Sequence, residues 1–266
     1  MQHFDGFLGK IYPVIQKQIE EAEKNVSFDE VKRQAEERRL PLVDATERLG
    51  HHETPVAVIA EIKRASPSLG DISNRNTLAQ VQAYVDGGAA AISVLTEQSH
   101  FKGSLADLTE LKTAFPYVPF LRKDFIVSEY QVYESKAAGA DILLLITQWL
   151  EDDELRRLHE LTRELGMQAL VETETDEDMR RARALGAEII GINARNLVDL
   201  SVDTNRVTAL ARTVRDKDFI LVGESGVDNP SVVRIWQEAG VDVALVGGAL
   251  MKTDDQVNMV REFSLI

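Results

Sequence analysis

A glycine followed closely by a short apolar run recurs along this chain, and it constrains the fold more than any other feature. The glycine ends a polar, helix-like segment, and the apolar run follows shortly after it. Glycine at such a place caps the carboxyl end of a helix, and a short continuous apolar run is typical of a buried strand. The copies lie at 86–95, 138–146, 165–171, 185–192 and 239–246. The repeated unit is therefore a helix followed by a strand.

Apolar runs begin near residues 56, 90, 119, 141, 168, 188, 219 and 242, which predicts eight strands. Charged amphipathic segments separate them, as at 151–165 and 176–185. Apolar strands that alternate with helices imply a parallel sheet covered by helices. Eight units predict an α/β fold, the (β/α)8 TIM barrel. The alternative is a doubly wound open sheet, which usually has fewer strands, and no Gly-x-Gly-x-x-Gly follows the first strand here.

The first fifty residues do not follow the repeat. Segments 4–24 and 28–39 read as two helices, with Ser27 as the N-cap of the second and Glu30 completing a capping box. This stretch is too short for an independent core. We therefore expect residues 1–266 to form a single barrel domain in which residues 1–50 are an N-terminal helical extension.

Composition narrows the class of function. The formal net charge is −14, which argues against nucleic acid or an anionic membrane as the main partner. The chain has no cysteine, and its five histidines show no metal-ligand spacing, so we predict no metal site. The N-terminus lacks the pattern of a signal peptide, and no apolar run is long enough to span a membrane. The expectation is a cytoplasmic monomer that binds a small molecule.

Polar residues follow the apolar runs at the places where the strands should end. Glu61 and Lys63 are two residues apart and so point to one face of an extended chain. Other predicted strands end in 122–124, Glu172, 193–196 and 224–226. Taken alone, one such charged residue could equally be a solvated loop residue or half of a structural ion pair as a member of an active site. Because the carboxyl ends of barrel strands meet at one mouth, the set together predicts an active site.

Glycines after the seventh and eighth strands indicate a phosphate site. Gly226, Gly247 and Gly248 leave backbone N–H groups unobstructed, and the last pair leads into a short predicted helix. The loops after these two strands form the recurrent phosphate site of the barrel. The alternative is that the glycines serve only as turn residues.

These motifs resemble those of the indole-3-glycerol phosphate synthase family. The resemblance covers about residues 56–251 and rests on Glu61-Ile-Lys-Arg-Ala-Ser-Pro-Ser-Leu-Gly70, 93–97, 121–126, 170–172, 190–197 and 223–227. It implies conversion of 1-(2-carboxyphenylamino)-1-deoxyribulose 5-phosphate into indole-3-glycerol phosphate, with release of carbon dioxide and water and without a cofactor. One departure lies at 247–251, where the family pattern predicts a polar residue at or just after Gly248.

The resemblance also implies a role for each matching residue. Lys123 matches the general acid of ring closure, Glu61 and Glu172 match the carboxylates of dehydration, and Lys63 adds positive charge or a second acid. How the proton transfers divide among these four stays open, because such groups titrate together. Asn193 and Ser225 are implied to orient the substrate, and Ser66 and Arg195 to bind its anthranilate end. Gly226, Gly247, Gly248 and Lys63 are implied to bind the phosphate, and Phe125 and Leu145 to line the aromatic pocket. Residues 66–70 would form a loop over the mouth.

Two other functions remain in competition. One is a Schiff-base aldolase with Lys63 or Lys123 as the nucleophile. The other is a barrel that binds a phosphorylated metabolite without catalysis, against which the presence of Glu61, Lys63, Lys123 and Glu172 together counts.

Overall fold

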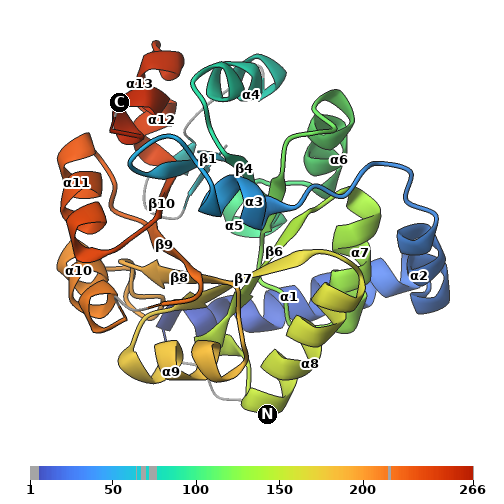
Figure 1. Cartoon of the computed structure of the whole chain (residues 1–266). Helices are drawn as coiled ribbons and strands as arrows, with labels where there is room; N and C mark the ends of the chain where they lie inside the picture. The colour runs from blue at the N-terminus through green and yellow to red at the C-terminus, as the bar shows by residue number, and fades with distance from the viewer. Residues whose placement is uncertain (1–5, 64, 67–69, 72–76, 215–216, 266) are drawn as a thin grey trace.

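Eight parallel strands within the described residues close into a barrel, which confirms the fold predicted from the glycine–strand units (Figure 1). The computed structural model describes residues 6–63, 65–66, 70–71, 77–214 and 217–265. Each strand pairs with the next along the chain, and β1 closes the ring against β10, which excludes the open sheet. The strands are β1 (Ala57–Ile62), β4 (Ala91–Leu95), β5 (Phe120–Lys123), β6 (Ile142–Ile146), β7 (Gln168–Thr173), β8 (Ile189–Asn193), β9 (Ile220–Glu224) and β10 (Val243–Val246).

Helices between the strands cover the outside of the barrel (Figure 1). Gly139 and Gly240 end two of them at φ 106° and 108°, the left-handed conformation that glycine adopts without strain. The covering helices are α4 (Thr77–Asp86), α6 (Leu105–Ala114), α7 (Glu129–Ala138), α8 (Asp152–Glu164), α9 (Asp176–Ala184), α10 (Thr204–Thr213), α11 (Pro230–Ala239) and α13 (Gln256–Phe263). None of the described helices is long and apolar enough to cross a membrane.

Short elements lie in the loops that follow the strands. They are α5 (Gln98–Phe101), the 3-10 turn η1 (Thr147–Trp149), α12 (Gly248–Lys252) and an antiparallel pair, β2 (Ala65–Ser66) with β3 (Gly70–Asp71). α12 is the short helix predicted after the eighth strand. Residues 67–69 of the predicted mouth loop and the side chain of Ser66 lie outside the described part of the structure.

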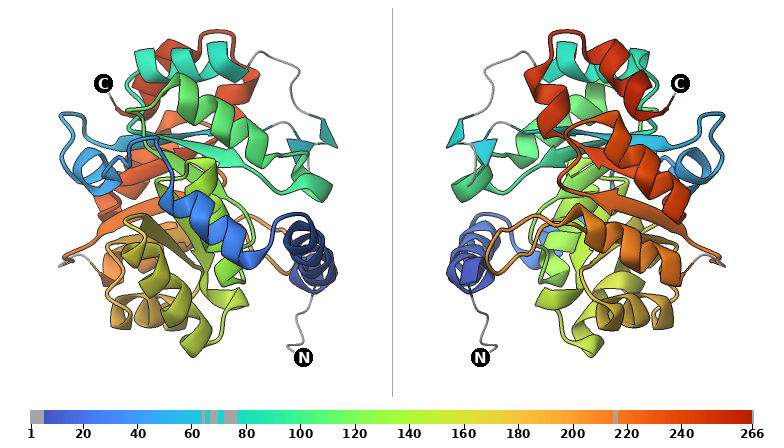
Figure 2. Two further views of the ribbon diagram at one scale, coloured as in Figure 1. Left: turned by 90° about the vertical axis from the view of Figure 1, so that its right-hand side faces the viewer. Right: turned by 90° about the vertical axis from the view of Figure 1, so that its left-hand side faces the viewer.

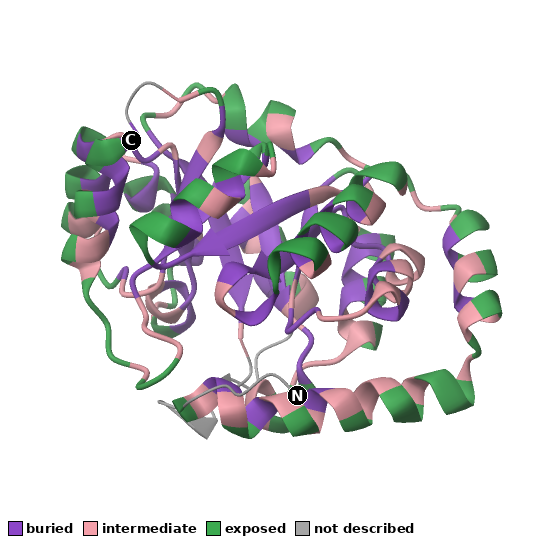
Figure 3. Cartoon of the chain, turned by 90° about the horizontal axis from the view of Figure 1, so that it is seen from below, coloured by how far each residue is buried: buried purple, intermediate pink, exposed green. Residues whose placement is uncertain are grey.

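The apolar core forms two layers because side chains on a strand alternate between its faces. On β6, Leu145 packs outward with the helices, whereas Leu144 and Ile146 point into the barrel. The inner layer also includes residues of the first helix, such as Ile11 and Ile15. The strands are buried along their length, while α1 alternates buried and exposed residues (Figure 3).

The N-terminal extension contains α1 (Gly6–Asn25), α2 (Phe28–Glu36) and α3 (Ala45–Gly50). The first two were predicted; α3 was not. Ser27 caps α2 by accepting from the Glu30 amide, as expected, but the Glu30 carboxylate bonds to Arg33 and Gln34. α1 lies on the same side of the barrel as the β2–β3 hairpin (Figure 2). The extension therefore reaches the end of the barrel where the predicted site lies.

Candidate active site

A cavity of about 480 Å³ lies at the carboxyl ends of the strands. Every polar or glycine residue predicted for the site lines it except Ser66, whose side chain is not described. Those residues are Glu61, Lys63, Lys123, Glu172, Asn193, Arg195, Ser225, Gly226, Gly247 and Gly248. Because they come from β1, β5, β7, β8, β9 and β10, closure of the barrel is what brings them together.

Lys123 is the centre of the charged groups. Its Nζ lies 2.9 Å from Glu172 Oε2 and 3.0 Å from Glu224 Oε2. Burial alone would lower the pKa of Lys123, but the attraction of Glu172, Glu224 and Glu61 outweighs burial and raises this pKa. The ammonium is therefore held protonated inside the cavity.

Glu224 is the functional candidate that the sequence reasoning passed over. It ends β9 and is 1% exposed, and its Oε1 has no hydrogen-bond partner among the described residues. Burial, together with repulsion from Glu172, outweighs Lys123 and raises the pKa of Glu224 to about 8. A Cβ at Gly191 would collide with this Oε1, so glycine leaves the room that the carboxylate occupies. The sequence feature that could have indicated a role for Glu224 is its position at the end of a predicted strand.

Glu61 and Lys63 point to one face, as their spacing predicts, and form an ion pair with 2.7 Å between Glu61 Oε1 and Lys63 Nζ. Glu61 is buried, and Lys63 keeps 22% of its side chain exposed. A Cβ on Gly247 would lie 2.6 Å from Glu61 Oε1. The pair therefore sits directly against the glycine loop that follows β10.

Asn193 connects the charged centre to the loop after β8. Its Nδ2 donates to Glu172 Oε1 at 2.8 Å, and its Oδ1 accepts from the Arg195 amide at 2.9 Å. One side chain thus orients a carboxylate of the Lys123 cluster and the start of the loop that carries Arg195. Ser225 follows Glu224 with φ 66°, an uncommon conformation for a residue other than glycine.

Apolar side chains form the rest of the cavity lining, and those of β6 lie between the strands that carry Lys123 and Glu172. Phe125 lines it, as predicted, and packs edge-on against Trp149 with ring centroids 4.6 Å apart. The prediction for Leu145 is wrong: strand alternation turns it outward, and Leu144 and Ile146 line the cavity instead. Phe7 of α1 also lines the cavity, a contribution from the extension that the sequence pattern did not indicate.

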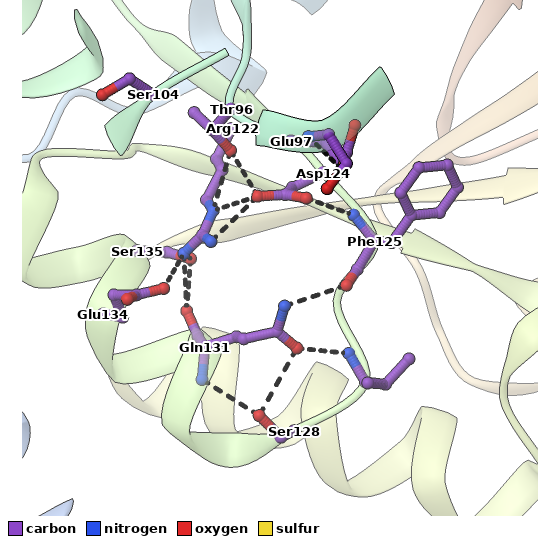
Figure 4. A network of polar contacts seen from close by, with 12 residues as sticks. Thr96, Glu97, Ser104, Arg122, Asp124, Phe125, Ser128, Gln131, Glu134 and Ser135 are labelled. Atoms are coloured by element: carbon purple, nitrogen blue, oxygen red, sulfur yellow. Dashed lines mark hydrogen bonds and ion pairs between the residues drawn. The ribbon is translucent and has the colours of Figure 1, made fainter. Parts of the chain in front are cut away.

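Arg122 and Asp124, which flank Lys123, serve a second network (Figure 4). Arg122 points away from the cavity and bonds to Asp124 at 3.0 Å, to Glu134 at 2.9 Å and to Ser135 Oγ at 3.0 Å. Thr96 Oγ1 donates to Asp124 Oδ2 at 2.5 Å. Burial opposes the charge of Arg122, but Asp124 and Glu134 raise its pKa. These bonds tie β5 to α7 and fix the strand end that presents Lys123.

Glu174 organises the loops around the rim. Its carboxylate accepts from Gln148 Nε2 at 2.8 Å and from Asn196 Nδ2 at 2.7 Å, and it pairs with Arg206 at 3.0 Å. The turn after β6, the loop after β8 and α10 are thereby joined at one buried group. Among the described residues, no group of three or more histidine, aspartate or glutamate side chains is arranged to hold a metal ion.

The family model for indole-3-glycerol phosphate synthase matches residues 8–263. The chain belongs to this family. It is 50% identical over 209 residues to an indole-3-glycerol phosphate synthase of Nocardioides sp., covering 78% of this chain and 80% of that one. A second member, from Arthrobacter sp., is 44% identical over 250 residues, covering 92% and 91% of the two chains.

Solved structures support the fold alone. A crystal structure of 3-hexulose-6-phosphate synthase superimposes with a TM-score of 0.64 at 19% identity, covering 79% of this chain and 99% of that one. The same enzyme from Salmonella typhimurium gives a TM-score of 0.61 at 15% identity, covering 79% and 97%. Assignment to the indole-3-glycerol phosphate synthase family therefore rests on the family model and the sequence relatives.

Proposed function

We propose that this chain converts 1-(2-carboxyphenylamino)-1-deoxyribulose 5-phosphate into indole-3-glycerol phosphate, carbon dioxide and water. The observation that carries the proposal is a protonated lysine, Lys123, held between two buried carboxylates at the mouth of a barrel of this family. The charged centre and the apolar wall around Phe125 suit a substrate with an aromatic ring and a polar chain.

In ring closure, Lys123 acts as the general acid. A ring carbon of the substrate attacks the ketone carbon, and the ketone oxygen takes a proton as it becomes a hydroxyl. The raised pKa of Lys123 keeps that proton available, and transfer to the developing alkoxide is favourable because the alkoxide is the stronger base. Glu172 and Glu224 hold the ammonium in place through the two short contacts.

Carbon dioxide then leaves from the ring carbon that made the attack, and the electrons of the broken carbon–carbon bond restore the aromatic ring. Arg195, which lines the cavity beside Asn193, would position the substrate carboxylate before this step, together with Ser66. The apolar wall at Leu144 and Ile146 excludes water from the ring during this step.

Dehydration needs one proton delivered to the departing hydroxyl and one removed from the ring system. In this proposal Lys63 is the second acid, and Glu61, at 2.7 Å from it, receives or returns its proton. Glu172, whose Oε1 accepts from Asn193, is the base. Glu224 has a pKa of about 8, so it can exchange a proton with Lys123 near neutral pH and reset the centre.

The glycine loops after β9 and β10 would bind the phosphate. Gly226, Gly247 and Gly248 line the same side of the cavity as Lys63, so backbone N–H groups and one ammonium can meet an anion there.

An aldolase mechanism is less compatible with this site. A Schiff-base lysine must lose its proton to attack a carbonyl, whereas the two carboxylates stabilise the protonated form of Lys123. Incubating the protein with the carboxyphenylamino substrate and following indole fluorescence tests the proposal. Absence of an indole signal would contradict it, and a borohydride-trapped adduct with a keto-phosphate would favour the aldolase.

We further propose that the chain acts as a cytoplasmic monomer with residues 1–50 integrated into one domain. Contacts of the extension with the barrel support the integration: the Phe7 amide donates to Val198 O at 3.0 Å, and Arg38 Nη1 donates to Ala140 O at 2.6 Å. A single calorimetric transition and a monomer mass by light scattering are the expected results.

A further inference from the structure

The cavity contains more acidic than basic side chains, which is unfavourable for an anionic substrate. Six carboxylates and four cations of the described residues line it, in a chain whose formal net charge is −14. The carboxylates belong to Glu61, Glu97, Asp124, Glu172, Glu224 and Asp228, and the cations to Lys63, Lys123, Arg195 and Lys252. Capture of an anion therefore depends on the cations whose charge is not already neutralised.

Lys252 is the lysine of this set that is not ion-paired. Lys63 is paired with Glu61, and Lys123 is shared by two glutamates. Within the described residues, no carboxylate lies at ion-pair distance from Lys252, and its side chain is exposed at the edge of the cavity. Its full positive charge is thus available to a ligand.

The placement of Lys252 on α12 directs it to the glycine end of the cavity. It follows Gly248 by four residues, so the two lie one turn apart on the same face of the helix. A Cβ built on Gly248 meets no heavy atom within 4 Å, so the space beside this position is unfilled. The neighbouring Gly247 packs against Glu61, so the Glu61–Lys63 pair contacts the residue that immediately precedes this position.

We propose that Lys252 is a phosphate ligand of this chain and supplies, from one helical turn away, the side-chain contact that Gly248 cannot make. The inference rests on the proposed function, since the phosphate is that of the carboxyphenylamino substrate. Lys252 spans the unfilled space with its flexible four-carbon chain and donates to a phosphate oxygen opposite Lys63. The result is a phosphate site with an ammonium on each side and glycine N–H groups between them.

The experiment titrates inorganic phosphate into the full-length protein at constant ionic strength and measures its dissociation constant. Lys252→Met is expected to weaken phosphate binding roughly tenfold, the effect of removing one charge-assisted hydrogen bond. Lys252→Arg should bind within about threefold of the original chain, because it retains the charge. Lys24→Met is the matched control: it removes the same charge from an exposed residue at the far end of α1.

Kinetics with the carboxyphenylamino substrate provide the second readout. Lys252→Met should raise KM roughly tenfold and leave kcat within about twofold, as expected for uniform binding. The double variant Gly248→Ser/Lys252→Met should regain affinity, because the serine enters unfilled space and restores a hydrogen-bond donor.

Phosphate affinity of Lys252→Met equal to that of Lys24→Met would overturn the proposal, as would a double variant no better than Lys252→Met. The phosphate titration does not depend on turnover. A failure of the proposed function, seen as no indole product from the unaltered chain, is therefore distinguishable from a failure of this inference.

Discussion

Two buried ion clusters lie at opposite ends of the barrel, and they have opposite charge balance. At the amino ends of the strands, the single carboxylate of Asp141 is shared by Lys112 at 2.8 Å and Arg38 at 3.1 Å. At the carboxyl ends, the single ammonium of Lys123 is shared by Glu172 at 2.9 Å and Glu224 at 3.0 Å. One cluster has a surplus of cations and the other a surplus of carboxylates.

The clusters also differ in how completely they are hydrogen-bonded. Both oxygens of Asp141 are engaged, since Oδ1 also accepts from the Val43 amide and Oδ2 from the Phe120 amide. Glu224 Oε1 is buried without a partner among the described residues. Burial lowers the pKa of Lys112, whereas the surrounding carboxylates raise that of Lys123 against burial. Full pairing indicates a structural cluster; surplus carboxylates and an unpartnered oxygen indicate proton transfer.

The largest expected effect comes from Lys123→Ala. We expect kcat to fall about 10³-fold or more because the general acid is lost, while KM changes by less than roughly tenfold. Steady-state indole fluorescence measures both values, and Lys24→Ala provides a lysine control outside the cavity. Normal turnover by Lys123→Ala would contradict the proposal that the Lys123 cluster transfers protons while the Asp141 cluster is structural.

Asp141→Asn should affect stability instead of chemistry. The substitution leaves Lys112 and Arg38 buried without their counter-charge, so we expect a loss of about 3–5 kcal/mol in the free energy of unfolding. Urea denaturation measures the loss, and kcat per folded molecule should stay within about twofold. Asp242→Asn is the matched control, because Asp242 also precedes a strand and pairs with a lysine but its side chain is 34% exposed; its loss should stay below about 1 kcal/mol.

Glu224→Gln tests the surplus carboxylate through pH. The pKa of Glu224 is raised from 4.5 to about 8, so the native state keeps a proton that the unfolded chain releases between these values. Stability contributed by this group is therefore present at low pH and declines as pH rises towards about 8. Glu224→Gln should flatten that decline, and it should remove a titration near pH 8 from the kcat/KM profile while lowering kcat roughly tenfold. An unchanged profile would show that Glu224 does not take part in proton transfer.

The smallest expected effect is that of Glu174→Gln at the rim. Weakening the pair with Arg206 should loosen the loop that carries Arg195 and raise KM about threefold with little change in kcat. Glu177→Gln, which alters an exposed pair with Arg180 on α9, is the control and should leave both constants unchanged. A large fall in kcat for Glu174→Gln would instead make the rim part of the catalytic centre.

The order of helices and strands could be predicted from the sequence because the repeated glycine and apolar run are local signals. The strand-end residues could also be predicted as a group, because the carboxyl ends of all strands of a barrel meet at one mouth. The separate directions of Arg122 and Lys123, adjacent in sequence, follow from strand alternation. A continuous apolar run does not indicate which of its residues point into the barrel and which point out. The predicted position of Leu145 was wrong for this reason.

What the sequence by itself determined was the barrel, the family, and the residue types collected at one end. What only the tertiary structure decided was which charges are neutralised there. Glu224 shares Lys123 with Glu172, and Phe7 reaches the cavity from α1, through contacts between segments far apart in the chain. Electrostatic energy and hydrogen bonding depend on distances and burial, and neither exists until the barrel closes.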